Sequence, residues 1–253
     1  QIKPGGTLLI NHTADPSVVA AAPVGTRVIR YGLTAGQGPE LFASNIFAEG
    51  HQFHFNLHGP EGTINNLELA VPGYHNVENM LAAAAVAQIQ GVGREQLRAA
   101  VAAYQGVKRR FEFVVTTAQN VYLDDYAHHP REIEAFLHSV RALYPHKRLR
   151  VIFQPHLFTR TRDFAAGFSK SLSIADEVFL LDIYPAREQP LPGITSEIIL
   201  ANITSPTKAI LTKEQVLSAA RTDDSFDVLA TVGAGDIDTL VPQLKLILME
   251  RWK

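Results

Sequence analysis

The chain has 253 residues, which is long enough for one large domain or two medium ones, each with its own core. Its formal net charge of −2 provides no whole-chain field that recruits nucleic acid or an anionic membrane. It has no cysteine, which excludes disulfides, thiolate catalysis and zinc–thiolate sites. No apolar run reaches the roughly 18–20 residues that span a bilayer. We therefore expect a cytoplasmic globular protein that binds neither nucleic acid nor a membrane.

The first part of the chain, residues 1–107, predicts a mixed sheet followed by two helices. Short buried-type strands are expected at 7–11 and 28–32, with a short helix at 15–20 between them. From 41 to 71 the pattern alternates and is interrupted by turn residues, which is typical of antiparallel strands. Two helices then follow, the second over 94–104. The buried side of the first helix is expected to carry Val77, Met80, Leu81, Ala84 and Ile89.

Residues 106–112 read as a hinge, after which the pattern changes to a regular alternation of strands and helices. This second part, residues 108–253, predicts a mostly parallel sheet covered by helices, and the chain is therefore expected to be of the α/β class. Strands are expected near 121–125, 149–153, 177–182, 208–211 and 227–232. Buried helix positions are expected at Ile133, Phe136, Leu137, Val140 and Leu143, and again at Phe164, Phe168 and Leu172.

Acidic, imidazole and guanidinium groups follow two of these strands. Asp124 and Asp125 end the first strand, and Pro130 opens a helix after His128 and His129. Capping is the simplest role for an Asp here, but crowding two carboxylates at one strand end favours a functional role. Neighbouring side chains of a strand point in opposite directions, so only one of the two is expected to face the crevice. Ligands of α/β sheets gather at this edge.

The histidines and arginines leave alternatives open. His128 and His129 lack a nearby third ligand, so hydrogen bonding is favoured over metal binding. Arg160 and Arg162 follow the next strand; a solvated pair is the simplest reading, but guanidinium groups also bind carboxylates and phosphates bidentately. We expect a functional role for one of the two arginines.

Two further segments could contact phosphates. The basic run 108–110 is either an ordinary linker or a grip on a polyphosphate at the hinge. The Gly-Ala-Gly-Asp run at 233–236 is either a phosphate-cradling turn or a site of close strand–helix packing. The phosphate loop G-x-x-x-x-G-K-[ST] is absent from the whole chain.

Several of these runs, taken together and in this order, resemble the Mur ligase family. The runs that carry the resemblance are 74–79, 106–112, 124–130, 153–163, 183–196 and 233–236. Members of this family have an amino-terminal UDP-sugar domain, a central ATPase domain and a carboxy-terminal Rossmann-like domain. The resemblance implies a partial central mixed-sheet ATPase domain over 1–107 and a Rossmann-like, mostly parallel sheet domain over 108–253. It thus implies a fragment that lacks the phosphate loop and is inactive by itself.

The run 153–163 is most similar to members that join L-alanine to UDP-N-acetylmuramate in peptidoglycan precursor synthesis, a pathway that serves cell shape and division. The resemblance implies an ATP- and Mg²⁺-dependent amide ligation through an acyl phosphate, completed by the upstream domains of the same protein. It implies nucleotide contacts by His75, Asn76, Arg110 and Asp125. It implies an alanine pocket formed by Tyr126, His128 and Arg160, with His128 as a candidate catalytic group; no metal ligand is assigned.

Three other readings remain. The chain could be a stand-alone nucleotide- or amino-acid-binding module, or part of the related ligase that recycles murein peptides, which shares the run 124–130 but is less similar over 154–156. A dinucleotide oxidoreductase is disfavoured because no G-x-G-x-x-G follows the first strand of the second domain. Some family members have a second arginine where this chain has Leu157, so Arg160 is expected to carry more of the carboxylate recognition.

Overall fold

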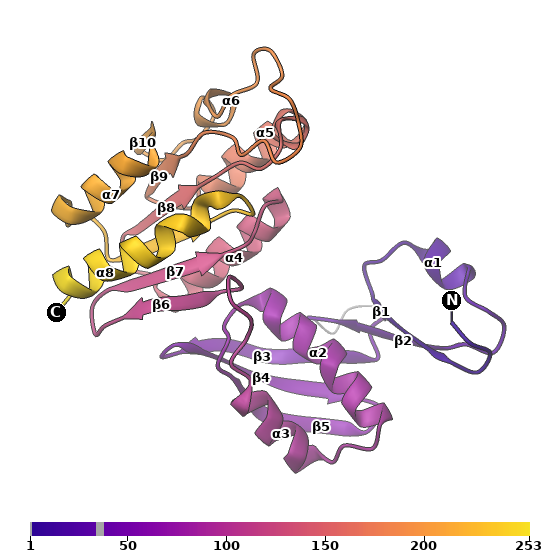
Figure 1. Ribbon diagram of the computed structural model, residues 1–253. Helices are drawn as coiled ribbons and strands as arrows, with labels where there is room; N and C mark the ends of the chain where they lie inside the picture. Colours follow the sequence, from indigo (N-terminus) through magenta and orange to yellow (C-terminus); the bar gives the residue numbers. More distant parts are fainter. Residues whose placement is uncertain (1, 34–37) are drawn as a thin grey trace. The chain divides into compact units, whose positions relative to one another are not determined.

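A computed structural model describes residues 2–33 and 38–253, and the chain divides into two compact units, Gln1–Gln105 and Gly106–Lys253 (Figure 1). The first unit contains β1 (Thr7–Asn11), α1 (Pro16–Ala20), β2 (Arg27–Gly32), β3 (Leu41–Glu49), β4 (Gln52–Gly59), β5 (Gly62–Leu69), α2 (Tyr74–Ile89) and α3 (Arg94–Ala103). Within the described residues of both units, no helix is long and apolar enough to cross a membrane.

The described part of the first unit forms a mixed sheet in the order β1-β2-β3-β4-β5. β1, β2 and β3 pair in parallel, whereas β3-β4 and β4-β5 pair antiparallel, as the alternation of residues 41–71 predicts. The turn between β3 and β4 contains Gly50, whose φ of +60° favours glycine. α2 and α3 lie over the face of this sheet formed by β3, β4 and β5 (Figure 1).

The buried side of α2 differs from the prediction at its last turn. Val77, Leu81 and Ala84 are buried as expected, but Ile89 is 42% exposed and Gln88 is buried instead. The buried positions advance by four and three residues, and this spacing leads from Ala84 to Gln88, not to Ile89. The expectation for Ile89 is therefore wrong, because a position twelve residues after Val77 is rotated about 120° away from it.

The second unit alternates strands and helices around one sheet. It contains β6 (Glu112–Thr116), β7 (Val121–Asp125), α4 (Pro130–Leu143), β8 (Leu149–Phe153), α5 (Phe158–Leu172), β9 (Glu177–Leu180), α6 (Glu197–Leu200), β10 (Thr207–Ile210), α7 (Lys213–Thr222), β11 (Val228–Val232), the 3₁₀ helix η1 (Asp236–Leu240) and α8 (Val241–Arg251). The strand order is β10-β9-β8-β11-β7-β6. All neighbours pair in parallel except β6, which runs antiparallel to β7 and was not among the expected strands.

Helices cover both faces of this sheet. On one face, side chains of α7, η1 and α8 pack against Tyr122, Ile152 and Leu229. On the other face lie α4 and α5 (Figure 1), where Phe168 packs against Phe153 of β8. Phe164 departs from its predicted burial, with 41% of its surface exposed, because its ring lies edge-on to the His129 ring at 4.8 Å and not in the core.

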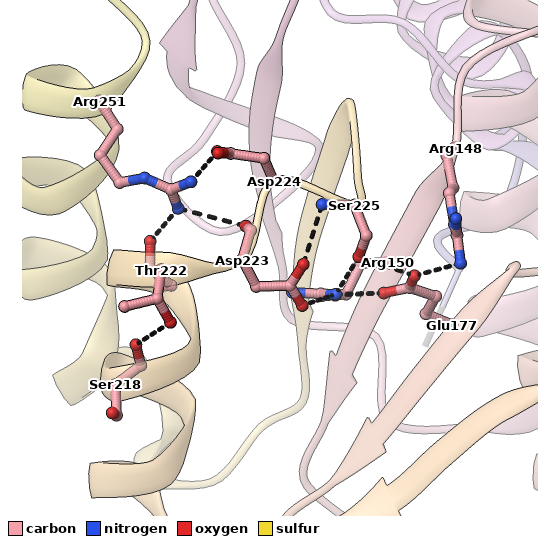
Figure 2. Close-up of polar contacts among 10 residues, drawn as sticks. Arg148, Arg150, Glu177, Ser218, Thr222, Asp223, Asp224, Ser225 and Arg251 are labelled. Carbon is pink, nitrogen blue, oxygen red and sulfur yellow. Dashed lines mark hydrogen bonds and ion pairs between the residues drawn. The ribbon is translucent and has the colours of Figure 1, made fainter.

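An ionic network lies at the amino ends of β8 and β9 (Figure 2). Arg150 is 3% exposed and donates to Glu177, to Asp223 and, over 2.8 Å, to the Ser225 hydroxyl. Arg148 adds a second cation to Glu177 at 2.8 Å. Burial alone would raise the pKa of the Asp223 carboxyl, but the Ser225 N–H and the Arg150 guanidinium lower it to about 2. Every charge here has a partner, which a buried charge requires.

Candidate active site

Polar side chains from three segments gather at the carboxyl edge of the second sheet. The segments follow β7, β8 and β9, and carry His128, His156 and Tyr184. The pairing of β8 with β9 continues past the strand ends through a parallel bridge between His156 and Tyr184, which places these two segments side by side. The sheet thus collects these side chains at the edge where α/β proteins bind ligands.

Asp124 and Asp125 point to opposite sides of β7, as the strand geometry predicts. Asp124 accepts a hydrogen bond from the Thr231 hydroxyl at 2.6 Å and pairs with Nε of Arg109 at 3.2 Å. Asp125 accepts from the backbone N–H groups of Phe111 and Ala127, each at 2.7 Å. Both carboxylates are almost fully buried, at 1% and 3% exposure.

The carboxylate of Asp125 holds the chain on both sides of β7. One oxygen binds the segment that enters the unit, at Phe111, and the other binds the segment that leaves β7, at Ala127. Burial raises the pKa of this carboxyl to about 6, although the two N–H donors and Arg110 oppose the shift. Both oxygens are thus already hydrogen-bonded to the backbone. The bond to Ala127 is the local capping that is the simplest role for this Asp, whereas the bond to Phe111 was not predicted.

The Tyr126 ring lies close to two consecutive arginines of the entering segment. The Arg109 guanidinium carbon is 5.1 Å from the ring centroid, and that of Arg110 is 5.3 Å from it. Arg110 is exposed, whereas Arg109 points inward and donates to the Gly233 carbonyl at 2.6 Å. Tyr126 in turn packs edge-on against His128, with 5.4 Å between the ring centroids.

His128 is oriented by the first turn of α4. Its Nδ1 lies 3.1 Å from the Tyr126 carbonyl oxygen and 3.3 Å from Oε2 of Glu132, both of which can only accept. Nδ1 therefore carries the hydrogen, and Nε2 of the neutral ring keeps its lone pair. Glu132 also accepts from the backbone N–H groups of His128 and His129, which caps the helix that Pro130 opens.

Arg160 lies in the first turn of α5 and contacts His156. Its Nη1 donates to Nδ1 of His156 at 3.4 Å, and the His156 ring stacks on Tyr184 with 5.7 Å between centroids. Burial lowers the pKa of His156, and Arg160 and His128 lower it further, so His156 stays neutral and accepts this hydrogen bond. The rings of His128 and His156 are 6.4 Å apart, which connects Tyr126, His128 and Arg160 through His156.

The residues around Arg160 show how α5 is held. Leu157, the N-cap residue, has φ +73°, which is unfavourable for a residue with a side chain. Glu188 receives two hydrogen bonds from Thr159, one from its N–H at 2.9 Å and one from its hydroxyl at 2.5 Å. Arg162 is exposed and pairs with Asp163, so of the two arginines it is Arg160 that lies among the clustered side chains.

The Gly-Ala-Gly-Asp run packs against the segment after β8. A Cβ atom on Gly233 would approach the Gln154 carbonyl oxygen to 2.7 Å, and one on Gly235 would approach the Tyr184 Cβ to 2.7 Å. Gln154 also donates to Asp236 and accepts from the N–H of Ile237. Of the two roles considered for this run, the geometry supports close packing and not a phosphate cradle. Beside it lies a cavity of about 280 Å³, lined in part by Tyr184, Lys213 and Asp236.

His75 and Asn76 lie in the first unit, in the first turn of α2. Asn76 donates from its side-chain amide to the Pro72 carbonyl at 2.8 Å. Gly73, with φ +123°, lets the backbone approach the His75 ring, where a Cβ would come within 2.8 Å of Cε1. The other predicted site residues, Arg110, Asp125, Tyr126, His128 and Arg160, all belong to the second unit.

Within residues 2–33 and 38–253, no group of three or more His, Cys, Asp or Glu side chains could hold a metal ion. Sequence reasoning did not single out Arg109, Glu132, His156 and Glu188, which hold the predicted residues in place. For Glu132 a signal was available, since it stands at the third position of the helix that Pro130 opens, where a Glu side chain caps the helix start. His156 precedes α5, and no such pattern marks it.

Two family models match the chain. The model described as Mur ligase, glutamate ligase domain, matches residues 109–237, and the Mur ligase middle domain matches residues 1–87. The UDP-N-acetylmuramate–L-alanine ligase of Porphyromonas gingivalis is 44% identical over 244 residues, which are 96% of this chain and 53% of the relative. The ligase of the same name from Cytophaga hutchinsonii is 39% identical and is covered to the same 53%. The chain spans about half the length of these relatives.

Solved structures share the fold. A UDP-N-acetylmuramate–alanine ligase from Thermotoga maritima superposes with a TM-score of 0.71 at 24% identity, covering 88% of this chain and 47% of that one. A murein peptide ligase from Psychrobacter arcticus gives a TM-score of 0.62 at 23% identity, covering 97% of this chain and 52% of that one. At these identities the likeness concerns the arrangement of the chain alone.

Proposed function

The chain belongs to the Mur ligase family, and we propose that it is the ATP- and amino-acid-binding part of a UDP-N-acetylmuramate–L-alanine ligase. Residues 1–107 would be the later part of its middle domain, and residues 108–253 its carboxy-terminal domain. Identities of 39–44% to ligases of that name over nearly the whole chain support this assignment. The observation that carries it is the cluster of Tyr126, His128, His156 and Arg160 at the carboxyl edge of the second sheet.

The reaction forms an amide in two steps. The γ-phosphoryl group of ATP is transferred to the carboxylate of UDP-N-acetylmuramate, giving an acyl phosphate and ADP. The uncharged amine of L-alanine then attacks the acyl carbon, and the tetrahedral intermediate expels inorganic phosphate. Because this chain contains no G-x-x-x-x-G-K-[ST] loop, we assign phosphoryl transfer to the remainder of the complete protein. This chain would hold the amine in place, and holding reactants together can contribute ~7–11 kcal/mol to lowering the barrier.

Arg160 is the group that we assign to the L-alanine carboxylate. Its Nη1 is directed by neutral His156, while a guanidinium retains further N–H groups that can donate to a carboxylate in a bidentate manner. Tyr126 and His128, linked edge-on at 5.4 Å, would form the wall of the same pocket. Arg162 would take no part, since it pairs with Asp163 at the surface.

His128 is the group that we assign to removal of the ammonium proton. An alkylammonium ion has no lone pair and must lose a proton before it can attack. With Nδ1–H directed at Glu132 and the Tyr126 carbonyl, the lone pair of Nε2 can accept that proton. A carboxylate behind the imidazole then stabilises the imidazolium that forms.

On the nucleotide side we assign Arg110 to ribose or phosphate oxygens, and His75 and Asn76 to the adenine. Arg110 is exposed and cationic, as such a contact requires. Asp125 was expected at the ribose, but both of its oxygens already bind backbone N–H groups. Its role in nucleotide binding would therefore be to fix the segment that carries Arg110. We propose that ATP is used as its Mg²⁺ complex and that the reaction takes place in the cytoplasm; no step is assigned to the metal.

Complementation tests the function most directly. Phosphate release is measured with ATP, Mg²⁺, L-alanine and UDP-N-acetylmuramate, with the purified chain alone and with the upstream half of a relative supplied separately. We expect no release from the chain alone, and L-alanine-dependent release from the mixture. Release that does not depend on L-alanine, or none with either preparation or with the complete protein, contradicts the proposal and favours a binding module.

A further inference from the structure

The Arg109 side chain makes three directed polar contacts, although the sequence pattern marked it only as one member of the basic run 108–110. Its Nη2 donates to the Gly233 carbonyl at 2.6 Å, its Nε pairs with Asp124 at 3.2 Å, and its Nη1 lies 3.4 Å from Asp238. These partners lie at the end of β7, in the turn after β11 and in η1. One side chain thus ties the entering segment of the second unit to two neighbouring strands and a helix.

The anchor beneath Arg109 is buried. Asp124 is 1% exposed and accepts from the Thr231 hydroxyl at 2.6 Å, while Thr231 lies 3.1 Å from the Tyr122 hydroxyl inside the sheet. A buried carboxylate needs a fixed cation or hydrogen-bond donors. Asp124 therefore holds the guanidinium in one place, and the guanidinium neutralises Asp124 in return.

The backbone around Arg109 is held in an unfavourable conformation. Arg109 has φ +60° and Phe111 has φ +51°, a region that residues with a side chain rarely adopt. Hydrogen bonds fix both: the Arg109 N–H donates to Glu112 at 2.8 Å, the Arg109 carbonyl accepts from Tyr126 at 2.7 Å, and the Phe111 N–H donates to Asp125 at 2.7 Å. A segment strained at two of three residues persists only because its surroundings determine it.

Arg110 lies between the two strained residues, Arg109 and Phe111. Arg110 is exposed, and its direction is set by the fixed residues on either side. Its guanidinium lies 5.3 Å from the Tyr126 ring, and that of Arg109 lies 5.1 Å from the same ring. Tyr126 itself is joined to Arg109 through the backbone bond of 2.7 Å.

We propose that Arg109 is a positioning residue that sets Arg110 and Tyr126 as one unit, so that nucleotide binding and amino-acid binding depend on the same anchor. This inference rests on the proposed function, which assigns Arg110 to the nucleotide and Tyr126 to L-alanine. A shared anchor makes the two affinities reciprocal: whatever factor the nucleotide adds to amino-acid binding, the amino acid adds to nucleotide binding.

Amide hydrogen exchange tests the anchor independently of any activity. In the 253-residue chain, Arg109→Met keeps an unbranched stem and removes every hydrogen bond of the guanidinium. We expect the amides of Arg110, Phe111 and Tyr126 to exchange roughly 10-fold faster or more, while those of β8 and β9 stay unchanged. Arg221→Met, at an exposed position of α7, is the matched control and leaves all of them unchanged. Unchanged exchange at the three amides in Arg109→Met overturns the anchor.

Kinetics of the complete protein test its consequence. We expect Arg109→Met to raise KM for ATP and KM for L-alanine together, each roughly 10-fold, with a smaller change in kcat. Arg109→Lys keeps the positive charge but not the planar set of guanidinium N–H donors, and it is expected to restore both KM values in part. A purely structural role would lower kcat through loss of folded protein and leave both KM values unchanged; that result overturns the proposal, as does a change in only one of them.

One further variant and the wild-type protein make the outcome interpretable if Arg109→Met does not fold or ligation is not observed. Arg109→Gly removes the side chain but relieves the strain at φ +60°, and it replaces Arg109→Met if that variant does not fold. We expect faster exchange at the same three amides in Arg109→Gly; unchanged exchange overturns the anchor. If the complete wild-type protein shows no ligation, the proposed function fails, whereas the exchange measurement still decides whether Arg109 fixes its neighbours.

Discussion

The two edges of the second sheet carry similar residue types in different states. At the amino edge, Arg150 and Glu177 are 3% and 1% exposed, and each has more than one charged partner. At the carboxyl edge, His128 and Arg160 are only partly buried, and each contacts its neighbours through one nitrogen. Saturated, buried charges support the fold, whereas partly exposed groups with remaining hydrogen-bonding capacity can bind a substrate.

The larger of the two cavities beside this sheet does not lie at the edge that carries the candidate site. The hollow beside the amino edge measures about 560 Å³ and is lined by residues such as Asn120, Asp224 and Arg251, of which the last two pair with each other. The cavity at the carboxyl edge measures about 280 Å³. We propose the chemistry for the carboxyl edge because the imidazole and guanidinium groups cluster there; of the cavity's lining residues, Tyr184 contacts this cluster by stacking on His156.

Breaking the amino edge is expected to have the largest effect. Glu177→Gln leaves Arg150 buried with one carboxylate fewer, and the loss of a buried partner costs ~3–5 kcal/mol of unfolding free energy. Urea unfolding of the second unit measures this loss of unfolding free energy. Glu134→Gln, whose partner Lys170 is exposed and 4.0 Å away, is the control and should change stability by no more than ~0.5 kcal/mol. A loss below about 1 kcal/mol for Glu177→Gln would show that the network does not carry the fold.

At the carboxyl edge, removing the candidate base should affect turnover and not folding. His128→Gln is expected to lower kcat of the complete protein about 100-fold, because proton removal from the ammonium loses its acceptor. Steady-state kinetics with saturating L-alanine measure it, and an unchanged unfolding midpoint separates it from damage to the fold. His138→Gln, exposed on the same helix, serves as the control. Unchanged turnover of His128→Gln excludes His128 as the base.

Arg160→Met should act on substrate affinity. Loss of the charged hydrogen bonds to the carboxylate is expected to raise KM for L-alanine roughly 10- to 100-fold. Arg162→Met, two residues away and paired at the surface with Asp163, should leave KM unchanged. Equal effects of the two substitutions would mean that the sheet edge attracts the substrate by its overall charge and not by a defined pocket.

The contributions of one carboxyl group at each edge to the free energy of unfolding are expected to depend on pH in opposite directions. Asp125, raised to a pKa of about 6 chiefly by burial, should protonate first as pH falls, and Asp223, with a pKa of about 2, should protonate last. Asp125 therefore contributes stability below about pH 4, the ordinary pKa of Asp, and this contribution is lost as pH rises through 6. Asp223 contributes stability above about pH 4, and this is lost as pH falls towards 2. Carboxyl ¹³C chemical shifts measure both midpoints, and equal midpoints would contradict the comparison.

Much of the fold follows from local pattern. The parallel strands of the second unit, the helix opened by Pro130 and the antiparallel strands between 41 and 71 appear where apolar periodicity and turn residues indicate them. The errors have physical causes. Ile89 and Phe164 were expected in the core, but helix rotation exposes the first and a contact with His129 holds the second at the surface. β6 was missed although its run Phe113-Val114-Val115-Thr116 is rich in the aromatic and β-branched residues that are typical of strands.

For the candidate site, too, some features follow from local sequence rules and others only from tertiary contacts. Residue types at the strand ends were sufficient to predict that acidic, imidazole and guanidinium groups meet at one edge of the sheet and that Asp124 and Asp125 face opposite ways, because strand geometry and the edge of an α/β sheet are local rules. The pocket of Tyr126, His128 and Arg160 was implied by the family resemblance and stays a prediction. The sequence could not show that Asp125 binds two backbone amides, that Gly233 and Gly235 make room for Gln154 and Tyr184, or that Arg109 rather than Arg110 points inward. Apart from the local bond to Ala127, these contacts join segments that are distant in the chain, by 14 residues for Asp125 with Phe111 and by 124 for Arg109 with Gly233. Only tertiary packing brings such segments within hydrogen-bonding distance.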